Sequence, residues 1–308
     1  SNSSDKCYVY FDIATFCEAN PNSLSCNIKN NLYTKDGEND LYYHDGVGTY
    51  TNASEEAEDN SYRYSGTNPN NYVCFGSDAA ICPDDNLYRI IGLFDDDGDG
   101  NYNIKLIKNE GMENEYTWSG SESNKNNNWS NSTLNTDVLN TTFLNDLSNW
   151  SDLIETTTWI VGGNTFSRLG ETNRSSNLYK YEITNPAEDI TYEAKVGLMY
   201  VSDYGYARSP ENWTKEFTED NWLYLDKYEW TITRNSEGVL ESNGTYSYYA
   251  FVVSVSGVII EHEVNSWLKT LYPEDQPLYI RPTFYLKPEA AITGGTGTLS
   301  DPYRLSVN

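Results

Sequence analysis

Two apolar stretches, Leu87-Tyr-Arg-Ile-Ile-Gly-Leu-Phe94 and Asn103-Ile-Lys-Leu-Ile-Lys108, decide the fold of this chain. Both have the length of a strand and are rich in the branched and aromatic side chains that fit a pleated sheet. The acidic segment 95–102 between them is short, and Gly100 permits a tight turn there. The two stretches are therefore expected to form a β-hairpin.

Further strand-like stretches follow the hairpin, and one stretch between them is helical. Apolar residues recur every three or four positions over 133–153, as on one face of a helix. Pro282 cannot donate a hydrogen bond to a ladder, so its strand is expected at an edge or a bulge. The pattern predicts a strand-dominated α+β fold with one or two helices and long loops. Strands are expected at 159–163, 195–200, 223–233, 246–255, 258–264, 279–286 and 303–307.

Charge and aromatic content narrow the classes of partner. The 308 residues carry a net charge of −26, whereas nucleic acids and anionic membranes are bound through clustered Lys and Arg. A divalent cation or a neutral glycan is compatible with this charge. No apolar run reaches the roughly 18 residues of a membrane-spanning helix, so we expect no membrane insertion by this segment. The 27 Tyr, nine Phe and eight Trp supply core material and argue against disorder.

Cysteine and histidine are distributed unevenly. Residues 83–308 contain no cysteine and a single histidine, His262. This removes thiol nucleophiles from most of the chain and leaves little for a histidine-based triad or a zinc site. The composition therefore favours a binding or structural protein over an enzyme.

The five cysteines predict disulfides and hence an oxidising, extracytoplasmic location. Cys74 and Cys82 bracket a short loop and are expected to form a local disulfide. Among Cys7, Cys17 and Cys26 the pair Cys17–Cys26 is preferred, while Cys7–Cys17 and Cys7–Cys26 stay open because spacing does not determine connectivity.

The chain is expected to divide near residue 70, with a small cystine-tied segment at 1–70 and an α+β domain at 71–308. It begins Ser-Asn-Ser-Ser with no signal peptide, so we expect a processed or trimmed ectodomain. If the parent protein is anchored, the anchor is expected to have been N-terminal.

Several strings resemble a domain of unknown function found in surface proteins of Gram-positive gut bacteria, over about residues 71–305. The resemblance implies an extracellular, cell-surface location, and some members look as if they carry a pilin-like N-terminal helix. The strings are Asn70-Asn-Tyr-Val-Cys-Phe-Gly76, Leu87–Phe94, Ile104–Lys108, Val196-Gly-Leu-Met-Tyr-Val-Ser-Asp-Tyr-Gly-Tyr-Ala207, Asn221-Trp-Leu-Tyr224, Trp230-Thr-Ile-Thr-Arg234 and Tyr279-Ile-Arg-Pro-Thr-Phe-Tyr-Leu-Lys287.

The late order of motifs is also similar, at the level of fold, to the C-type-lectin and formylglycine-generating-enzyme superfold. This similarity implies a C-type-lectin-like core. Formylglycine-type oxidation needs late cysteines, and none follows Cys82. The Glu-Pro-Asn or Gln-Pro-Asp motif of the lectin calcium–sugar site is absent too, so neither activity is carried over to this chain.

The acidic loop is the sharpest candidate for chemistry. Its alternating aspartates match the first half of an EF-hand-type calcium loop, although Leu106 stands where a bidentate Glu is required. The alternative is an acidic hairpin turn without a metal. If Ca2+ binds, we expect the weak affinity of extracellular sites, about 10⁻⁴–10⁻³ M. The candidate ligands are Asp95, Asp97, Asp99, Asn101 and Asn103.

A second candidate is a surface where aromatic and polar residues alternate. Exposed aromatic rings stack on sugars while amides and carboxylates bind the hydroxyl groups. Trp213 lies in a loop rich in Pro and charge and is expected to be exposed, whereas Trp159, Trp222 and Trp230 are expected in the core. Arg281 is expected to pair with an internal acid such as Asp203. The candidate ligand-binding residues are Asp203, Tyr204, Tyr206, Asn212 and Trp213.

The leading hypothesis is a non-catalytic extracellular module for binding or adhesion, with a glycan or a host-surface protein as ligand. One alternative is the globular head of a pilin-like appendage subunit that self-assembles through a missing N-terminal segment. Another is a glycan hydrolase that uses a pair of carboxylates. Glu261 and Glu263 are one such pair in the sequence, but an exposed strand face explains them more simply.

Overall fold

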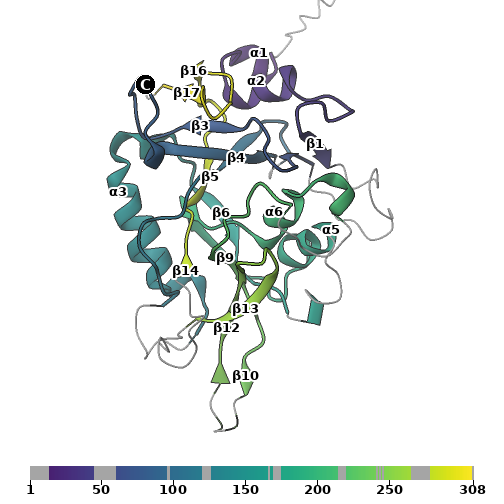
Figure 1. Cartoon of the computed structure of the whole chain (residues 1–308), viewed down its shortest axis with the longest axis vertical. Coiled ribbons are helices and arrows are strands. Elements are labelled where there is room, and N and C mark those ends of the chain that lie inside the picture. Colours follow the sequence, from purple (N-terminus) through teal and green to yellow (C-terminus); the bar gives the residue numbers. More distant parts are fainter. Residues whose placement is uncertain are drawn as a thin grey trace, which may run out of the picture.

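The computed structural model confirms a strand-dominated α+β fold. The strands form two main sheets, and the helical segments lie along their sides (Figure 1). The structure describes residues 14–44, 60–95, 98–119, 126–165, 167–168, 175–213, 220–240, 242, 244, 246–264 and 278–306.

The larger sheet is built around the expected hairpin. Strands β4 (Leu87–Phe94) and β5 (Asn103–Lys108) pair antiparallel and coincide with the two predicted stretches. Nearly every residue of both strands is buried, because the sheet is covered on its two faces. The order is β16-β17-β3-β4-β5-β15-β8, and β2 pairs with both β1 and β4. The remaining strands are β1 (Leu41–His44), β2 (Ser61–Tyr64), β3 (Tyr72–Cys74), β8 (Val196–Gly197), β15 (Thr283–Leu286), β16 (Ile292–Gly294) and β17 (Tyr303–Leu305).

The smaller sheet has the order β13-β12-β9-β14, and two ribbons accompany it. The β10–β11 ribbon lies at the end of the molecule opposite α1 and α2 (Figure 1). The strands of this sheet are β9 (Tyr228–Arg234), β12 (Tyr249–Val253), β13 (Ile259–Glu263) and β14 (Leu278–Tyr279). The ribbons pair β6 (Thr157–Ile160) with β7 (Thr191–Ala194) and β10 (Val239–Leu240) with β11 (Tyr246–Ser247).

The predicted helix at 133–153 is present, but its winding changes along its length. It is a π-helix over Leu134–Phe143, an α-helix over Leu144–Asp146 (α3) and a 3-10 helix over Ser148–Leu153. Further α-helices are α1 (Phe16–Ala19), α2 (Leu24–Asn31), α5 (Ser175–Tyr179) and α6 (Val201–Tyr206). A π-helix follows α5 over Lys180–Thr184 (η5), and 3-10 turns lie at Asp84–Asn86, Trp129–Asn131 and Pro210–Asn212.

Three expected strands are shorter than predicted. The stretch 195–200 is a strand only at β8, because α6 begins at Val201, and the stretch 223–233 begins only at β9. The stretch 279–286 is divided between the two sheets, with β14 in one and β15 in the other. Pro282 lies between them, so its missing N–H falls outside both ladders. Of the two expectations for Pro282, an edge strand or a bulge, the edge strand is therefore wrong, since β15 is flanked by β5 and β8. Pro282 marks the break between β14 and β15.

The boundary expected near residue 70 crosses a continuous sheet. Strand β2 pairs with β4, and Leu24 and Ile28 of α2 belong to the same hydrophobic cluster as Phe284 of β15. The N-terminal part described here thus contributes to the main core instead of forming its own.

Both favoured disulfides are present. Cys17–Cys26 joins α1 to α2, with 5.5 Å between the Cα atoms, and Cys74–Cys82 closes the loop after β3, with 5.7 Å. Cys7 lies outside the described residues. In the part of the chain that the structure describes, no helix is both long and apolar enough to cross a membrane.

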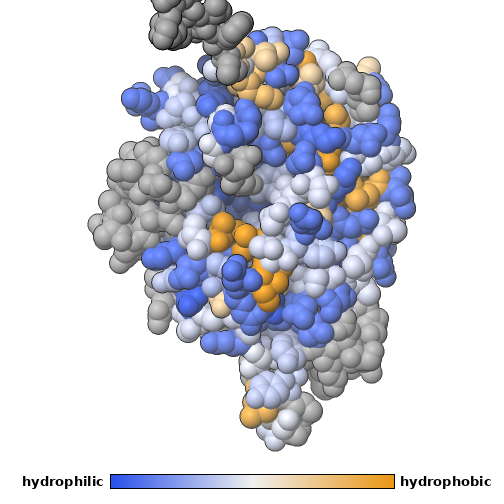
Figure 2. Space-filling model, turned by 180° about the vertical axis from the view of Figure 1, so that it is seen from behind, coloured by the Kyte–Doolittle hydropathy of each residue, from blue (hydrophilic) through white to orange (hydrophobic). Residues whose placement is uncertain are grey.

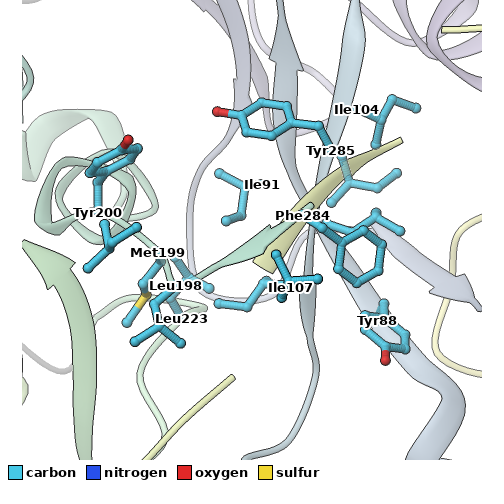
Figure 3. Close-up of a cluster of buried hydrophobic side chains, with 14 of the residues drawn as sticks. Tyr88, Ile91, Ile104, Ile107, Leu198, Met199, Tyr200, Leu223, Phe284 and Tyr285 are labelled. Carbon is cyan, nitrogen blue, oxygen red and sulfur yellow. The ribbon is translucent and has the colours of Figure 1, made fainter. Parts of the chain in front are cut away.

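The core is centred on β15. Phe284 is fully buried, and its ring lies 5.0 Å from that of Phe75 and 5.5 Å from that of Tyr88, measured between centroids. Figure 3 shows Phe284 beside Ile107, with Leu198 and Met199 next in the cluster. The face turned away from the view of Figure 1 is mostly hydrophilic, with small separate groups of hydrophobic residues (Figure 2).

We expect Phe284→Ala to destabilise the fold strongly, because it opens a cavity where β4, β5 and the π-helix meet. The loss of unfolding free energy should be about 3–5 kcal/mol, measured by urea denaturation. Leu299→Ala is the control, since Leu299 is 61% exposed and should change stability by less than about 0.5 kcal/mol. Similar losses in both variants would contradict this central role.

Candidate functional site

A cleft of about 990 Å³ opens between β5, β6, α5, η5 and α6. Its floor holds Arg63, Lys105 and Asp203, which come from β2, β5 and α6. Its walls combine aromatic rings with the threonines of β6, and its rim carries the acidic loop between β4 and β5. The volume lies at the upper end of the range of roughly 300–1,000 Å³ found for small-molecule pockets.

Asp203 organises the floor of the cleft. Its Oδ1 accepts a hydrogen bond from Arg63 at 2.9 Å, and its Oδ2 accepts one from Lys105 at 2.6 Å. All three side chains are at most 2% exposed. Burial opposes ionisation, but the charges of Lys105 and Arg63 outweigh it and lower the pKa of Asp203. The carboxylate therefore stays ionised and compensates one of the two positive charges beside it.

Aromatic rings surround the two cations. The Lys105 ammonium lies 4.6 Å from the ring centroid of Tyr200 and 5.2 Å from that of Tyr285. The Arg63 guanidinium lies 4.6 Å from the centroid of Phe94 and 5.6 Å from that of Tyr179. These contacts are within the range of cation–π attraction and help to hold the two cations in place beside Asp203.

Glu182 holds α6 against the neighbouring elements. Its carboxylate accepts hydrogen bonds from the N–H groups of Val201 at 3.0 Å and Ser202 at 2.8 Å, at the start of α6. It also accepts a short bond from the Thr233 hydroxyl on β9. Burial raises the pKa of Glu182 to about 7. Because α6 carries Asp203, this buried carboxyl helps to position the cleft floor.

The acidic loop forms one side of the rim. The Gly100 N–H donates to Asp95 Oδ2 at 3.1 Å. The N–H and the Nδ2 of Asn101 donate to Asp99 at 2.7 and 2.5 Å. The carboxylates thus stabilise the turn itself, as expected of an acidic hairpin loop.

The expected calcium ligands fall partly inside the described residues. Asp95, Asp99, Asn101 and Asn103 line the cleft, whereas Asp97 lies outside the described part. Within that part, no group of three or more His, Cys, Asp or Glu side chains could hold a metal. The calcium site therefore stays a prediction from the sequence.

The expected aromatic binding surface is buried. Trp213 is only 3% exposed, and its Nε1–H donates to the carbonyls of Tyr206 and Arg208 at 3.1 and 2.9 Å. Tyr204 is fully buried, and its hydroxyl donates to the Gly257 carbonyl at 3.0 Å. The expectation that Trp213 is exposed is therefore wrong, because its indole N–H donates to backbone carbonyl groups at and just after the end of α6.

Five residues were expected to bind the ligand. Among the described residues that line the cleft, Asp203 is the one member of this set. Asn212 is half-buried and donates to Asp220 at 2.9 Å, and Tyr206 is 5% exposed. The core positions expected for Trp159, Trp222 and Trp230 are confirmed.

Arg281 does not pair with Asp203, contrary to expectation. Its Nε and Nη2 donate to the two carboxylate oxygens of Glu229 on β9, at 2.6 and 2.7 Å. Asp203 instead forms ion pairs with Arg63 and Lys105, which precede it in the chain by 140 and 98 residues. Sequence reasoning overlooked both, because a single Arg or Lys within a strand gives no local signal for so distant a partner.

Comparison with protein-family models, curated proteins and solved structures gives no match for this chain. The resemblance to surface-protein domains and to the lectin-like superfold therefore stays a prediction. The geometry of the cleft is then the main basis for inferring a function.

We expect Asp203→Asn to be strongly destabilising, because it leaves two buried cations without their counter-charge. Leaving a buried charge without its partner typically costs about 3–5 kcal/mol of unfolding free energy, which urea denaturation would measure. Lys105→Met is the matched variant and should cost less, because Arg63 and Asp203 remain paired. Equal losses in the two variants would show that charge compensation is not what Asp203 provides.

We expect the stability to fall as the pH rises through neutrality. The folded-state pKa of Glu182, about 7, lies above the ordinary value of 4.5 for a glutamate, so the stabilisation from its proton is complete below about pH 4.5 and is lost as the pH passes 7. Between about pH 5 and pH 8 this group should remove about 2–3 kcal/mol. Urea denaturation at each pH should show this loss in the wild type and a flatter profile in Glu182→Gln. Parallel profiles would contradict the assignment.

Proposed function

We propose that this chain is a non-catalytic extracellular binding module and that a glycan is bound in the cleft. The cleft itself supports the proposal, because it joins aromatic rings, hydroxyl and amide groups and a floor whose cations already share a buried carboxylate. A neutral polyhydroxylated ligand needs these groups and brings no charge of its own.

The walls offer complementary contacts for a sugar. Tyr179 lies half-buried in the lining and adds an aromatic ring, the kind of group on which the apolar face of a pyranose stacks. Thr156 and Thr158 are exposed along the cleft, and Asn103 is half-buried at its rim. Hydroxyl and amide side chains both donate and accept hydrogen bonds, as sugar hydroxyl groups require.

The chemistry of the floor favours binding over hydrolysis. A glycosidase needs one carboxyl group that carries a proton to the leaving oxygen. Asp203 is unsuited to this role, because Lys105 and Arg63 hold its pKa low and occupy both its oxygens. Glu182 has a raised pKa, but its carboxyl group bonds the start of α6 and Thr233 and does not line the cleft.

The location is inferred from the disulfides. Two disulfides in one chain are compatible with an oxidising, extracellular compartment. We place the protein on the surface of a Gram-positive bacterium on the strength of the sequence resemblance. The alternative of a pilin-like head depends on the N-terminal segment, of which residues 1–13 lie outside the described part.

The test is binding of the full chain to a panel of neutral, amino and acidic oligosaccharides, with calorimetry on every hit. Thr158→Trp places a bulky side chain in the cleft and should weaken binding at least about tenfold, a loss of about 1.4 kcal/mol. Thr191→Trp is the matched control, since Thr191 is exposed on β7 of the same ribbon, outside the cleft lining.

Failure of the folded wild type to bind any oligosaccharide would overturn the proposal. Equal binding by both Trp variants would overturn the assignment of the ligand to the cleft. Circular dichroism of each variant would establish that it is folded.

A further inference from the structure

The smaller sheet ends in a strand with an open outer edge. In the order β13-β12-β9-β14, β13 has a neighbouring strand on one side only. The Val264 N–H donates to the Tyr248 carbonyl, and hydrogen-bonded pairs alternate with non-bonded pairs along an antiparallel ladder. The backbone N–H and C=O groups of Ile259, Glu261 and Glu263 therefore point away from β12. They have no backbone partner in the described part of the chain.

The same edge carries apolar side chains on both faces of the sheet. Successive residues of a strand point to opposite faces, so Ile259 lies on one face and Ile260 on the other. Both are half-buried and pack against the core, and Val258 just before them is 36% exposed. Sheet edges of this kind are usually protected by Lys, Pro or a covering segment. A strand that covers this edge should be apolar at consecutive positions.

The chain itself contains a segment of this composition. Residues 7–13 read Cys-Tyr-Val-Tyr-Phe-Asp-Ile and lie outside the described residues. Aromatic and branched side chains at consecutive positions, without Pro or Gly, favour a strand that is apolar on both faces. The segment is also long enough to pair with all of β13, which has five residues. An apolar segment with such β-propensity associates readily with an exposed strand edge.

The arrangement favours a contact between two copies of the chain. Helix α1, which follows the segment, lies at one end of the molecule, whereas β13 belongs to the half that ends in the β10–β11 ribbon (Figure 1). Direct pairing of two β13 strands is disfavoured, because Glu261 is the middle residue of β13 and would face Glu261 of the second copy.

We propose that residues 7–13 of one copy add as a further strand to the outer edge of β13 in a second copy, so that the chains associate head to tail. Backbone hydrogen bonds to Ile259, Glu261 and Glu263 supply affinity, as in other cases of strand addition. The contact is heterologous and can continue along a row of copies, since each copy keeps one free segment or one free edge. It is independent of glycan binding, because no described residue of β13 lines the cleft.

The experiment is analytical ultracentrifugation of the full chain over a range of concentrations. Cys7→Ser serves as the parent, so that no disulfide can join two copies. Salt at about 0.15 M or above screens the repulsion between copies that each carry a charge of −26. We expect the average mass of the parent to rise with concentration.

Two proline substitutions should suppress this association. Val9→Pro disrupts the segment, and Ile259→Pro removes an outward N–H at the first position of β13, where proline is tolerated. Each should raise the concentration needed for association at least about tenfold, a loss of about 1.4 kcal/mol. The controls are Ser3→Pro, outside the segment, and Thr191→Pro, at the exposed first position of β7. Both should behave as the parent does.

A mixture of the two variants tests the head-to-tail arrangement directly. Val9→Pro keeps an intact edge, and Ile259→Pro keeps an intact segment. Their equimolar mixture should therefore form a dimer and nothing larger, although neither variant associates alone. Circular dichroism of each variant would establish that it is folded.

Several outcomes would overturn the proposal. These are a parent that stays monomeric at every concentration, association that persists in Val9→Pro, a mixture that stays monomeric, or loss of association in Thr191→Pro. If Ile259→Pro does not fold, a synthetic peptide of residues 5–14 with Cys7→Ser replaces it as a competitor. The peptide should dissociate the parent, and the same peptide with Val9→Pro should not. Failure of the first peptide, or equal effects of both, would contradict the role of the segment.

Discussion

The contact on which the rest of this structure depends is the pair of ionic bonds that Asp203 makes with Arg63 and Lys105. The three residues belong to β2, β5 and α6, so their charges can be buried together only when these elements are correctly placed. A buried charge without a partner costs several kcal/mol, whereas the complete group is close to neutral in its effect. The arrangement therefore acts against alternative placements of α6 more than it adds stability. The cleft is shaped by the same requirement, because these charged groups form its floor.

Buried carboxylates occupy other junctions of the fold in the same way. Glu229 of β9 binds Arg281, which lies on the short connection between β14 in one sheet and β15 in the other. Glu182 joins η5 to the start of α6 and to β9. Each of these contacts links elements that the hydrophobic core alone would leave free to shift, since apolar contact is not directional. Among the described residues, Glu182, Asp203 and Glu229 are the buried acids, and each of the three lies at such a junction.

The charged groups also differ between two regions of the cleft. At the floor, Asp203 compensates one of the two positive charges of Arg63 and Lys105, and aromatic rings enclose the group. The rest of the lining includes the carboxylates of Asp95, Asp99 and Glu155. The charge of the cleft thus changes between its buried part and its more exposed part.

The sequence by itself determined the α+β class, the central hairpin of β4 and β5, the helical stretch at 133–153 and the two disulfide pairs. These depend on local patterns: alternation or continuity of apolar residues, turn chemistry and short spacing between cysteines. Only the tertiary structure decided that Trp213 is buried, that Pro282 lies where the chain passes between two sheets, and that Asp203 binds Arg63 and Lys105 instead of Arg281. Each of these outcomes depends on a partner far away in the chain, and ion pairs and burial are set by proximity in space, which a single sequence does not record.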